Sequence, residues 1–227
     1  MSKNKKFSLL DTNNKSVSFK KNRILQIIAA VYMTVFVIFS INPVNTFNWW
    51  YESIIPLAVI FLLAFLYKRN RFSNFAYFCI LIVLVLHAVG SHYTYAACPV
   101  GIWVSHYFGL VRNDFDRVVS FSYGLMISIP VLESIYRRMR IRYIGACILA
   151  VAIILVGAAL YELFEAFSAM LLSTGYEEVF LGLQGDLWDS QKDMAFAVLG
   201  SSVSMSLCIL LRLNKNHKIH MVRYQNN

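Results

Sequence analysis

Six long apolar runs, separated by short segments with unequal numbers of lysines and arginines, constrain this chain more than any other feature. Hydrophobic residues make up 58% of its 227 residues and charged residues only 15%, whereas about a quarter of a soluble domain is charged. A helix rises about 1.5 Å per residue, so ~20 apolar residues cross a hydrocarbon core of ~30 Å. The sequence therefore predicts an all-α fold: a polytopic integral membrane helical bundle of about six transmembrane helices.

The predicted spans and tails divide the whole chain. The spans cover residues 24–41, 51–67, 72–93, 117–136, 143 to beyond 160, and 193–211. We expect Pro56 in the opening turn of the second span, where a helix tolerates proline. The predicted domains are a basic cytoplasmic tail (1–23), a six-span membrane domain (24–211) and a second basic cytoplasmic tail (212–227).

The cationic residues predict the orientation in the membrane. Of the 21 Lys and Arg, 18 lie in the alternate segments that include both tails, and three lie on the opposite side. Because positive residues accumulate on the cytoplasmic side, both termini are predicted to be cytoplasmic. The formal net charge of +9 then predicts contact with anionic membrane lipids. We expect no nucleic acid partner, and the sequence names no protein partner.

The acidic residues gather at the opposite, outward side. Ten of the 12 Asp and Glu lie there or just inside it. An ionisable residue at membrane depth costs at least ~2.5 kcal/mol when it faces lipid, so such residues usually face a bundle interior or a wet cavity. Because four segments bring ionisable groups to the same depth in the membrane, we predict an outward-facing site. Four residues are candidates for catalysis: Asp116, Arg117, Glu162 and Glu165. Three are candidates for metal binding: His87, Asp186 and Asp189.

The expected chemistry follows from these residue types. Carboxylates would bind a cation or polarise water, Arg117 would orient an anionic group, and His87 would serve as a base or a ligand. Oxygen ligands favour Mg²⁺, Mn²⁺ or Ca²⁺, whereas histidine ligands shift the preference towards Zn²⁺. The cofactor is therefore unknown from the sequence, with a divalent cation as the candidate.

Several of these signals also have structural explanations. Ser190 and Asp193 have the spacing of a capping box, in which Asp193 would satisfy the first turn of the last span. Arg117 would pair with Asp116 or a glutamate to neutralise a helix end. Residues 176–185 alternate acidic and apolar side chains, which predicts a short lid-like or interfacial element. Residues 95–110 are aromatic with interspersed Gly and Pro, and we expect them to lie along the outer surface.

Small residues recur at spacings of three and four residues in two of the predicted spans. Gly124 and Ser128 form one such stripe, and Ala197, Gly200 and Ser204 form another. Small side chains at four-residue spacing let two helices approach closely. Each stripe leads from a charged residue, Arg117 or Asp193, so we expect the packed faces and the polar cluster to point the same way.

Four stretches carry a family resemblance, namely residues 86–96, 112–117, 161–165 and 181–194, and the Gln-Gly-Asp-x-Trp-Asp run (184–189) is the most specific. In this order they resemble the YjdF-like family of bacterial inner-membrane proteins, whose biochemical role is unassigned. The resemblance implies a multi-pass protein of the bacterial cytoplasmic (inner) membrane. Ser120 stands where the family more often has His, which weakens a metal site held by histidines. At the level of architecture alone, the pattern is also similar to VanZ-like membrane proteins.

Three functions of different classes stay open. The first, which we favour, is a binding protein whose acidic and histidine-containing site holds a cation or a lipid headgroup. The second is a metal-assisted intramembrane hydrolase acting on an envelope lipid or similar substrate. The third is a small transporter, which would need polar residues through the inner leaflet. No recognised catalytic motif is present, so the sequence leaves open whether the protein is an enzyme.

Overall fold

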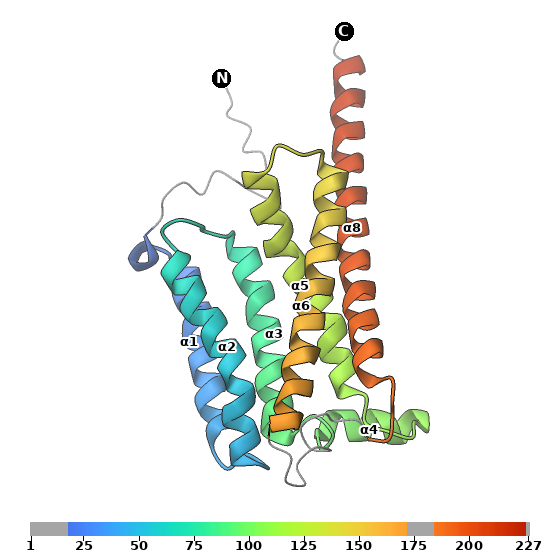
Figure 1. Cartoon of the computed structure of the whole chain (residues 1–227). Coiled ribbons are helices and arrows are strands. Elements are labelled where there is room, and N and C mark those ends of the chain that lie inside the picture. Colours follow the sequence, from blue (N-terminus) through green and yellow to red (C-terminus); the bar gives the residue numbers. More distant parts are fainter. Residues whose placement is uncertain (1–17, 172–183, 226–227) are drawn as a thin grey trace.

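The computed structural model describes residues 18–171 and 184–225, and these residues form a bundle of helices (Figure 1). In chain order the elements are η1 (Phe19–Lys21), α1 (Arg23–Ser40), α2 (Thr46–Leu66), α3 (Asn74–Tyr93), α4 (Pro99–Phe108), α5 (Phe115–Arg138), α6 (Tyr143–Leu171) and α8 (Asp189–Gln225). Six helices, all of these α-helices except α4, are long and apolar enough to cross a membrane. The predicted fold class is confirmed.

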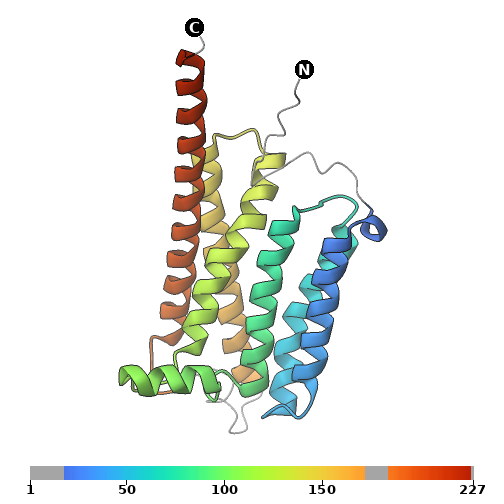
Figure 2. The same cartoon turned by 180° about the vertical axis from the view of Figure 1, so that it is seen from behind.

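The two ends of the bundle differ in the elements that they carry. The helix α1 begins and α8 finishes at the same end, whereas α4 lies crosswise at the other end (Figures 1 and 2). We call this second end the α4 end. The side chains of Trp103 and Tyr107 on α4 are largely exposed, as expected for a helix lying in a membrane interface. The segment predicted to lie along a surface is therefore this short helix.

Small residues hold α5 and α8 together, in the most extensive helix pair of the bundle. A Cβ added at Gly124 would lie 1.9 Å from the carbonyl oxygen of Ala197, and one at Gly200 would lie 2.2 Å from that of Phe121. Only glycine permits such a close backbone approach. The small-residue stripes are thus sites of close helix approach, and the structure shows that the two stripes face each other. This contact places the start of α8 beside the start of α5.

The helix α2 begins five positions earlier than predicted. Asn45 caps it, because the Asn45 side chain accepts a hydrogen bond from the backbone N–H of Asn48 at 3.0 Å. Pro56 consequently lies inside the helix, and its predicted place in the opening turn is wrong. The earlier start also places Glu52 in the second turn of α2 rather than at the beginning of the helix.

Residues 172–183 lie outside the described residues. They include most of the predicted lid-like element with Glu177 and Glu178, so that prediction stays untested. On either side of them, α6 extends to Leu171 and α8 begins at Asp189, which brings both helix ends to the α4 end of the bundle (Figure 1).

Candidate functional site

A cavity of about 440 Å³ lies among α2, α3, α5, α6 and α8. Six carboxyl side chains line it towards the α4 end: Glu52, Asp116, Glu162, Glu165, Asp189 and Asp193. Further from that end, the walls are apolar and include Val59, Ile80 and Ile127. No Lys or Arg of the described chain lines this space. The cavity therefore has an acidic end and an apolar end.

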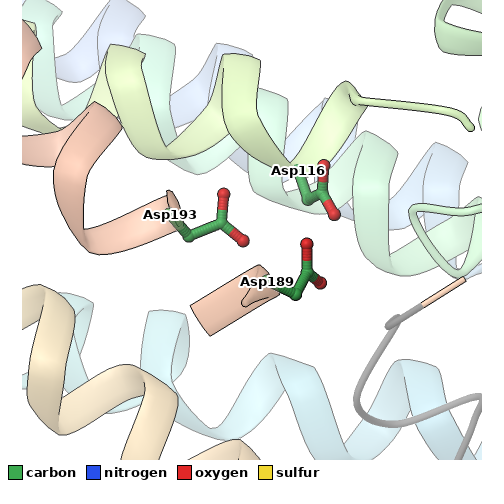
Figure 3. Close-up of side chains that lie close together, drawn as sticks. All are labelled: Asp116, Asp189 and Asp193. Atoms are coloured by element: carbon green, nitrogen blue, oxygen red, sulfur yellow. The ribbon is translucent and has the colours of Figure 1, made fainter. Parts of the chain in front are cut away.

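Three aspartates converge on one side of the acidic end. Asp116 comes from α5, and Asp189 and Asp193 come from the first two turns of α8. One carboxylate oxygen of each residue lies within 4.8 Å of those of the other two, and the three side chains point towards a common space (Figure 3). Like charges this close repel each other strongly in a poorly solvated site, so the group requires positive charge or protons.

Asp193 is the least satisfied of the three aspartates. The residue is only 7% exposed, and it lines the cavity. Its Oδ1 atom is buried and has no hydrogen-bond partner among the described residues. Because a buried carboxylate oxygen without a partner is costly, this atom indicates a missing ligand.

Two arginines hold the aspartates from the side away from the cavity. The Nη2 group of Arg117 lies 2.8 Å from both Asp186 Oδ2 and Asp189 Oδ1. Arg112 forms ion pairs with Asp116 and Asp189. These contacts tie the start of α8 to the start of α5 and its preceding loop. Arg117 is thus in a structural ion-pair network, and its predicted role in orienting an anionic ligand stays a prediction.

The whole network carries an excess of negative charge. It joins five aspartates (Asp114, Asp116, Asp186, Asp189, Asp193) to three cations (Arg112, Arg117, Lys192), which leaves two formal negative charges. The Lys192 ammonium lies 2.6 Å from Asp186 and holds the pKa of that carboxyl below its ordinary value. Asp186 thus lies among the cations, whereas Asp193 faces the cavity without one.

Asn113 explains how the loop before α5 is held. Its Nδ2 group donates to the carbonyl oxygens of Ala96 and Cys98 at 2.9 and 3.0 Å. Its backbone N–H and carbonyl pair with the side-chain amide of Gln184, both at 3.0 Å. Two of the four stretches that carry the family resemblance, 112–117 and 181–194, thus contact each other here, and Asn113 positions the neighbouring Arg112.

Glu52 and His87 form the α2 and α3 wall of the acidic end. The His87 Nε2 group lies 3.0 Å from the backbone carbonyl oxygen of Glu52, and the Tyr95 hydroxyl lies 2.6 Å from Nδ1. The Glu52 carboxylate accepts from Asn48 at 2.6 Å and from Ser91 at 2.8 Å. Both ring nitrogens of His87 are therefore engaged within the protein, so this arrangement offers neither to a metal.

Tyr95 reaches His87 because the chain turns back after α3. Thr94 and Tyr95 both adopt positive φ, +61° and +51°, and the Tyr95 ring lies against Gly90, where an added Cβ would be 2.4 Å from the ring. Burial, followed by the charges of Glu52 and Glu165, raises the pKa of Tyr95 well above its ordinary value. The hydroxyl therefore stays protonated and donates to Nδ1.

Glu162 and Glu165 form the α6 wall of the acidic end. Glu162 interacts electrostatically with Asp116 and Asp189, and Glu165 interacts with Glu162, Glu52 and Asp193. The ion pairs of the described chain include neither of these α6 glutamates. Both side chains face the cavity, so five separate helices contribute to its lining.

The structure brings some of the predicted site residues together and separates others. Five of the seven line the cavity: His87, Asp116, Glu162, Glu165 and Asp189. Asp186 and Arg117 lie in the ion-pair network behind it. Whether this cavity is a functional site stays a prediction at this point.

Sequence reasoning missed or underrated two cavity residues. Glu52 lies within the predicted second span (51–67) and was not singled out, although a carboxylate inside an apolar run is itself a signal of a functional site. The capping-box interpretation of Asp193 is wrong, because α8 begins at Asp189 rather than after Ser190. Asp193 therefore lies in the second turn of the helix.

Comparison with known proteins agrees with this architecture. A family model described as predicted membrane protein (DUF2238) matches residues 24–214, which include every residue that lines the cavity. The chain is also similar to the inner membrane protein YjdF of Escherichia coli (strain K12). That match has 33% identity over 179 residues and covers 76% of this chain and 83% of the relative. No solved structure matches the chain.

Proposed function

Since this chain belongs to the DUF2238 family of predicted membrane proteins, we propose its function from its own geometry: it binds a divalent cation between α5 and α8. The protein is a multi-pass inner-membrane protein with six apolar helices. The cation lies at the acidic end of the cavity, which the charge distribution predicts to face outward.

One observation carries this proposal. The carboxylates of Asp116, Asp189 and Asp193 converge within 4.8 Å, and a buried Asp193 oxygen has no partner within the described chain. The aspartate network also has two negative charges more than its three cations neutralise. A single divalent cation supplies the missing charge and the missing partner together.

The ligand set indicates the type of cation. Three carboxylates offer oxygen ligands only, and both nitrogens of His87 are engaged elsewhere. Hard cations such as Mg²⁺, Ca²⁺ and Mn²⁺ prefer oxygen, whereas Zn²⁺ prefers nitrogen and sulfur. We therefore expect one of these hard cations, with water completing its coordination.

Elemental analysis of the purified full-length protein tests the proposal. The wild type, prepared in buffer with Mg²⁺, Ca²⁺ and Mn²⁺ and then desalted, should retain about one divalent cation per chain. The Asp193→Asn variant should lose it, because an amide supplies one neutral oxygen in place of a carboxylate. Asp114→Asn is the matched control, since Asp114 belongs to the network but not to the converging group, and it should retain the cation.

Two results would contradict the proposal. One is a wild-type protein that holds none of the three cations and is not stabilised against heat by adding them. The other is an Asp193→Asn variant that retains as much cation as the wild type. A chelator should lower the melting temperature of the wild type and leave that of Asp193→Asn unchanged, because a ligand that binds only the folded state stabilises it.

A metal-assisted hydrolase is the second candidate. It is favoured by Glu162 and Glu165, which face the cavity beside the aspartates and could serve as a general base for cation-bound water. Lipid profiling of a deletion strain separates the two candidates, since only a hydrolase changes product levels. Transport has less support, because the described residues at the inner end of the cavity are apolar.

A further inference from the structure

We propose that the cavity also holds a membrane lipid with a primary-amine headgroup, its ammonium at the glutamates and one chain in the apolar end. This inference rests on the proposed function in one respect. The divalent cation occupies the aspartates of the acidic end, which leaves the glutamates for the ammonium. It is carried by the polarity of the walls, the charge of the lining and the arrangement of the flanking helices.

Along α5, the polar and apolar groups that line the cavity follow the same order as the regions of a lipid molecule. From the α4 end inward, the lining residues are Asp116, Val119, Ser120, Tyr123 and Ile127. The polar groups among them, one carboxylate and two hydroxyls, all come before Ile127, which lies 11 residues or roughly 16 Å of helix from Asp116. A lipid has the same sequence of regions: a charged head, polar ester groups and a hydrocarbon chain.

The helix α2 shows the same order on its cavity face. Glu52 is followed by Ile55, Pro56 and Val59, at the spacings of three, four and seven residues that share one helix face. On α6, which runs in the opposite direction, Glu165 is followed inward by Tyr161 and Ala158. Three walls therefore share one polarity gradient along the bundle axis.

The charge of the lining selects an amine. Glu52, Glu162 and Glu165 line the cavity and take part in no ion pair of the described chain. The sequence of residues 172–183, which connect α6 to α8, contains no Lys or Arg either. An ammonium group complements these carboxylates, whereas a purely anionic headgroup would be repelled.

The arrangement of the helices indicates a lipid rather than a water-soluble amine. The helix α2 packs chiefly against α3, while α6 packs against α5 and α8, so α2 and α6 flank the cavity without packing closely (Figure 1). Near the acidic end they meet through the stacked rings of Tyr51 and Phe164, 4.8 Å apart. The apolar part of the cavity therefore lies between helices that face the bilayer. The whole cavity, with a volume of about 440 Å³, is in the range of small-ligand sites.

Lipid analysis of the purified full-length protein tests this inference. We expect mass spectrometry of the extracted lipids to find an amine-headed lipid at about one per wild-type chain, enriched several-fold over its share in the membrane. Val59→Trp should lose most of it, because the indole fills the apolar end. Leu62→Trp is the matched control on the same helix, since Leu62 is exposed outside the cavity, and it should retain the lipid.

A second measurement does not depend on the folding of a variant. Delipidated wild-type protein is titrated with phosphatidylethanolamine or with phosphatidylglycerol of identical chains, and the melting temperature is followed. We expect phosphatidylethanolamine to bind several-fold more tightly, and the Glu52→Gln, Glu165→Gln double variant to lose this preference. Equal binding of the two lipids, or a Val59→Trp protein that keeps the lipid, would overturn the inference.

Metal content measured on the same samples separates the two proposals. A wild-type protein with the cation and no enriched amine lipid contradicts only the lipid. A protein with the lipid and no cation contradicts the proposed function and the division of the acidic end.

Discussion

The imidazole of His87 donates to the backbone carbonyl oxygen of Glu52 across a distance of 3.0 Å between Nε2 and oxygen. This carbonyl lacks its usual helical partner, because the residue four positions later is Pro56, which has no N–H. A carbonyl oxygen only accepts, so the contact places the ring proton on Nε2 and leaves Nδ1 to accept from Tyr95. One proline thus explains why a buried histidine links α2 to α3 at the cavity.

A double-mutant cycle tests this link. His87→Leu should lower the free energy of unfolding by about 1–3 kcal/mol, since it leaves a buried carbonyl without a donor. In a Pro56→Ala background the new N–H at position 56 reaches the same carbonyl, so the cost of His87→Leu should fall by ~1 kcal/mol. Chemical unfolding of the four proteins in mixed micelles measures the coupling.

The control for this cycle uses the other histidine of α3. His92 Nδ1 bonds to the carbonyl oxygen of Phe39 at 2.8 Å, which Pro56 does not affect. His92→Leu should therefore cost the same in both backgrounds. Equal costs of His87→Leu in the two backgrounds would contradict the role assigned to Pro56.

The close contact between α5 and α8 predicts a strong effect of a single methyl group. Gly124→Ala should lower the free energy of unfolding by about 1–3 kcal/mol or more, because the new Cβ would meet the backbone of Ala197 at 1.9 Å and force the helices apart. Gly145→Ala on α6 is the control, since nothing lies within 4 Å of its added Cβ. It should be neutral or stabilising by up to ~1 kcal/mol. Similar losses in both variants would show that close approach is not the cause.

The buried ion-pair network predicts a large effect of removing one arginine. Arg117→Gln should lower the free energy of unfolding by about 3 kcal/mol, because it leaves Asp186 and Asp189 with less compensating charge. An added divalent cation should recover part of this loss. Arg140→Gln, at an exposed position between α5 and α6, should change stability by less than ~0.5 kcal/mol. An Arg117→Gln protein as stable as Arg140→Gln would rule out this role.

The depressed pKa of Asp186 predicts a pH-dependent contribution to stability. A carboxyl whose pKa is lower in the folded state stabilises that state above its ordinary pKa, ~3.9, and loses this effect as pH falls through the folded value. The melting temperatures of wild type and Asp186→Asn should therefore differ by a constant amount above about pH 5 and converge below about pH 4.

Lys192→Met provides the check on the cause. It removes the ammonium that contributes most to the shift, so the difference from the Asp186→Asn, Lys192→Met protein should be smaller above about pH 5 and should vanish at a higher pH. A difference between wild type and Asp186→Asn that persists unchanged to pH 2 would contradict this account.

Much of the fold could be predicted because hydropathy and charge are properties of short stretches of chain. The six spans and the surface helix α4 follow from such stretches. The start of α2 was misplaced, because an asparagine cap at Asn45 begins the helix five residues before the predicted span. Glu52 lay within the predicted span in either case, but its contact with His87 depends on how α2 and α3 pack, which the sequence does not show.

The depth of the candidate site in the membrane could be predicted from the sequence, but the direction in which each side chain points could not. The sequence showed that Asp116, Asp189 and Glu162 lie at similar depth, since each is a known number of residues from a helix end. Depth does not determine which way a side chain points. Whether Asp193 caps a helix or faces a cavity depended on the position at which α8 begins.

The sequence by itself determined that this is an all-helical membrane protein with acidic residues gathered at one end, because these properties require only local composition and the thickness of a bilayer. The tertiary structure alone decided which acids pair with Arg112 and Arg117 and which face the cavity without a cation. The physical reason is that helix rotation is set by packing between distant segments. Gly124 and Gly200 bring α5 and α8 into contact, and this contact turns Asp193 towards Asp116 (Figure 3).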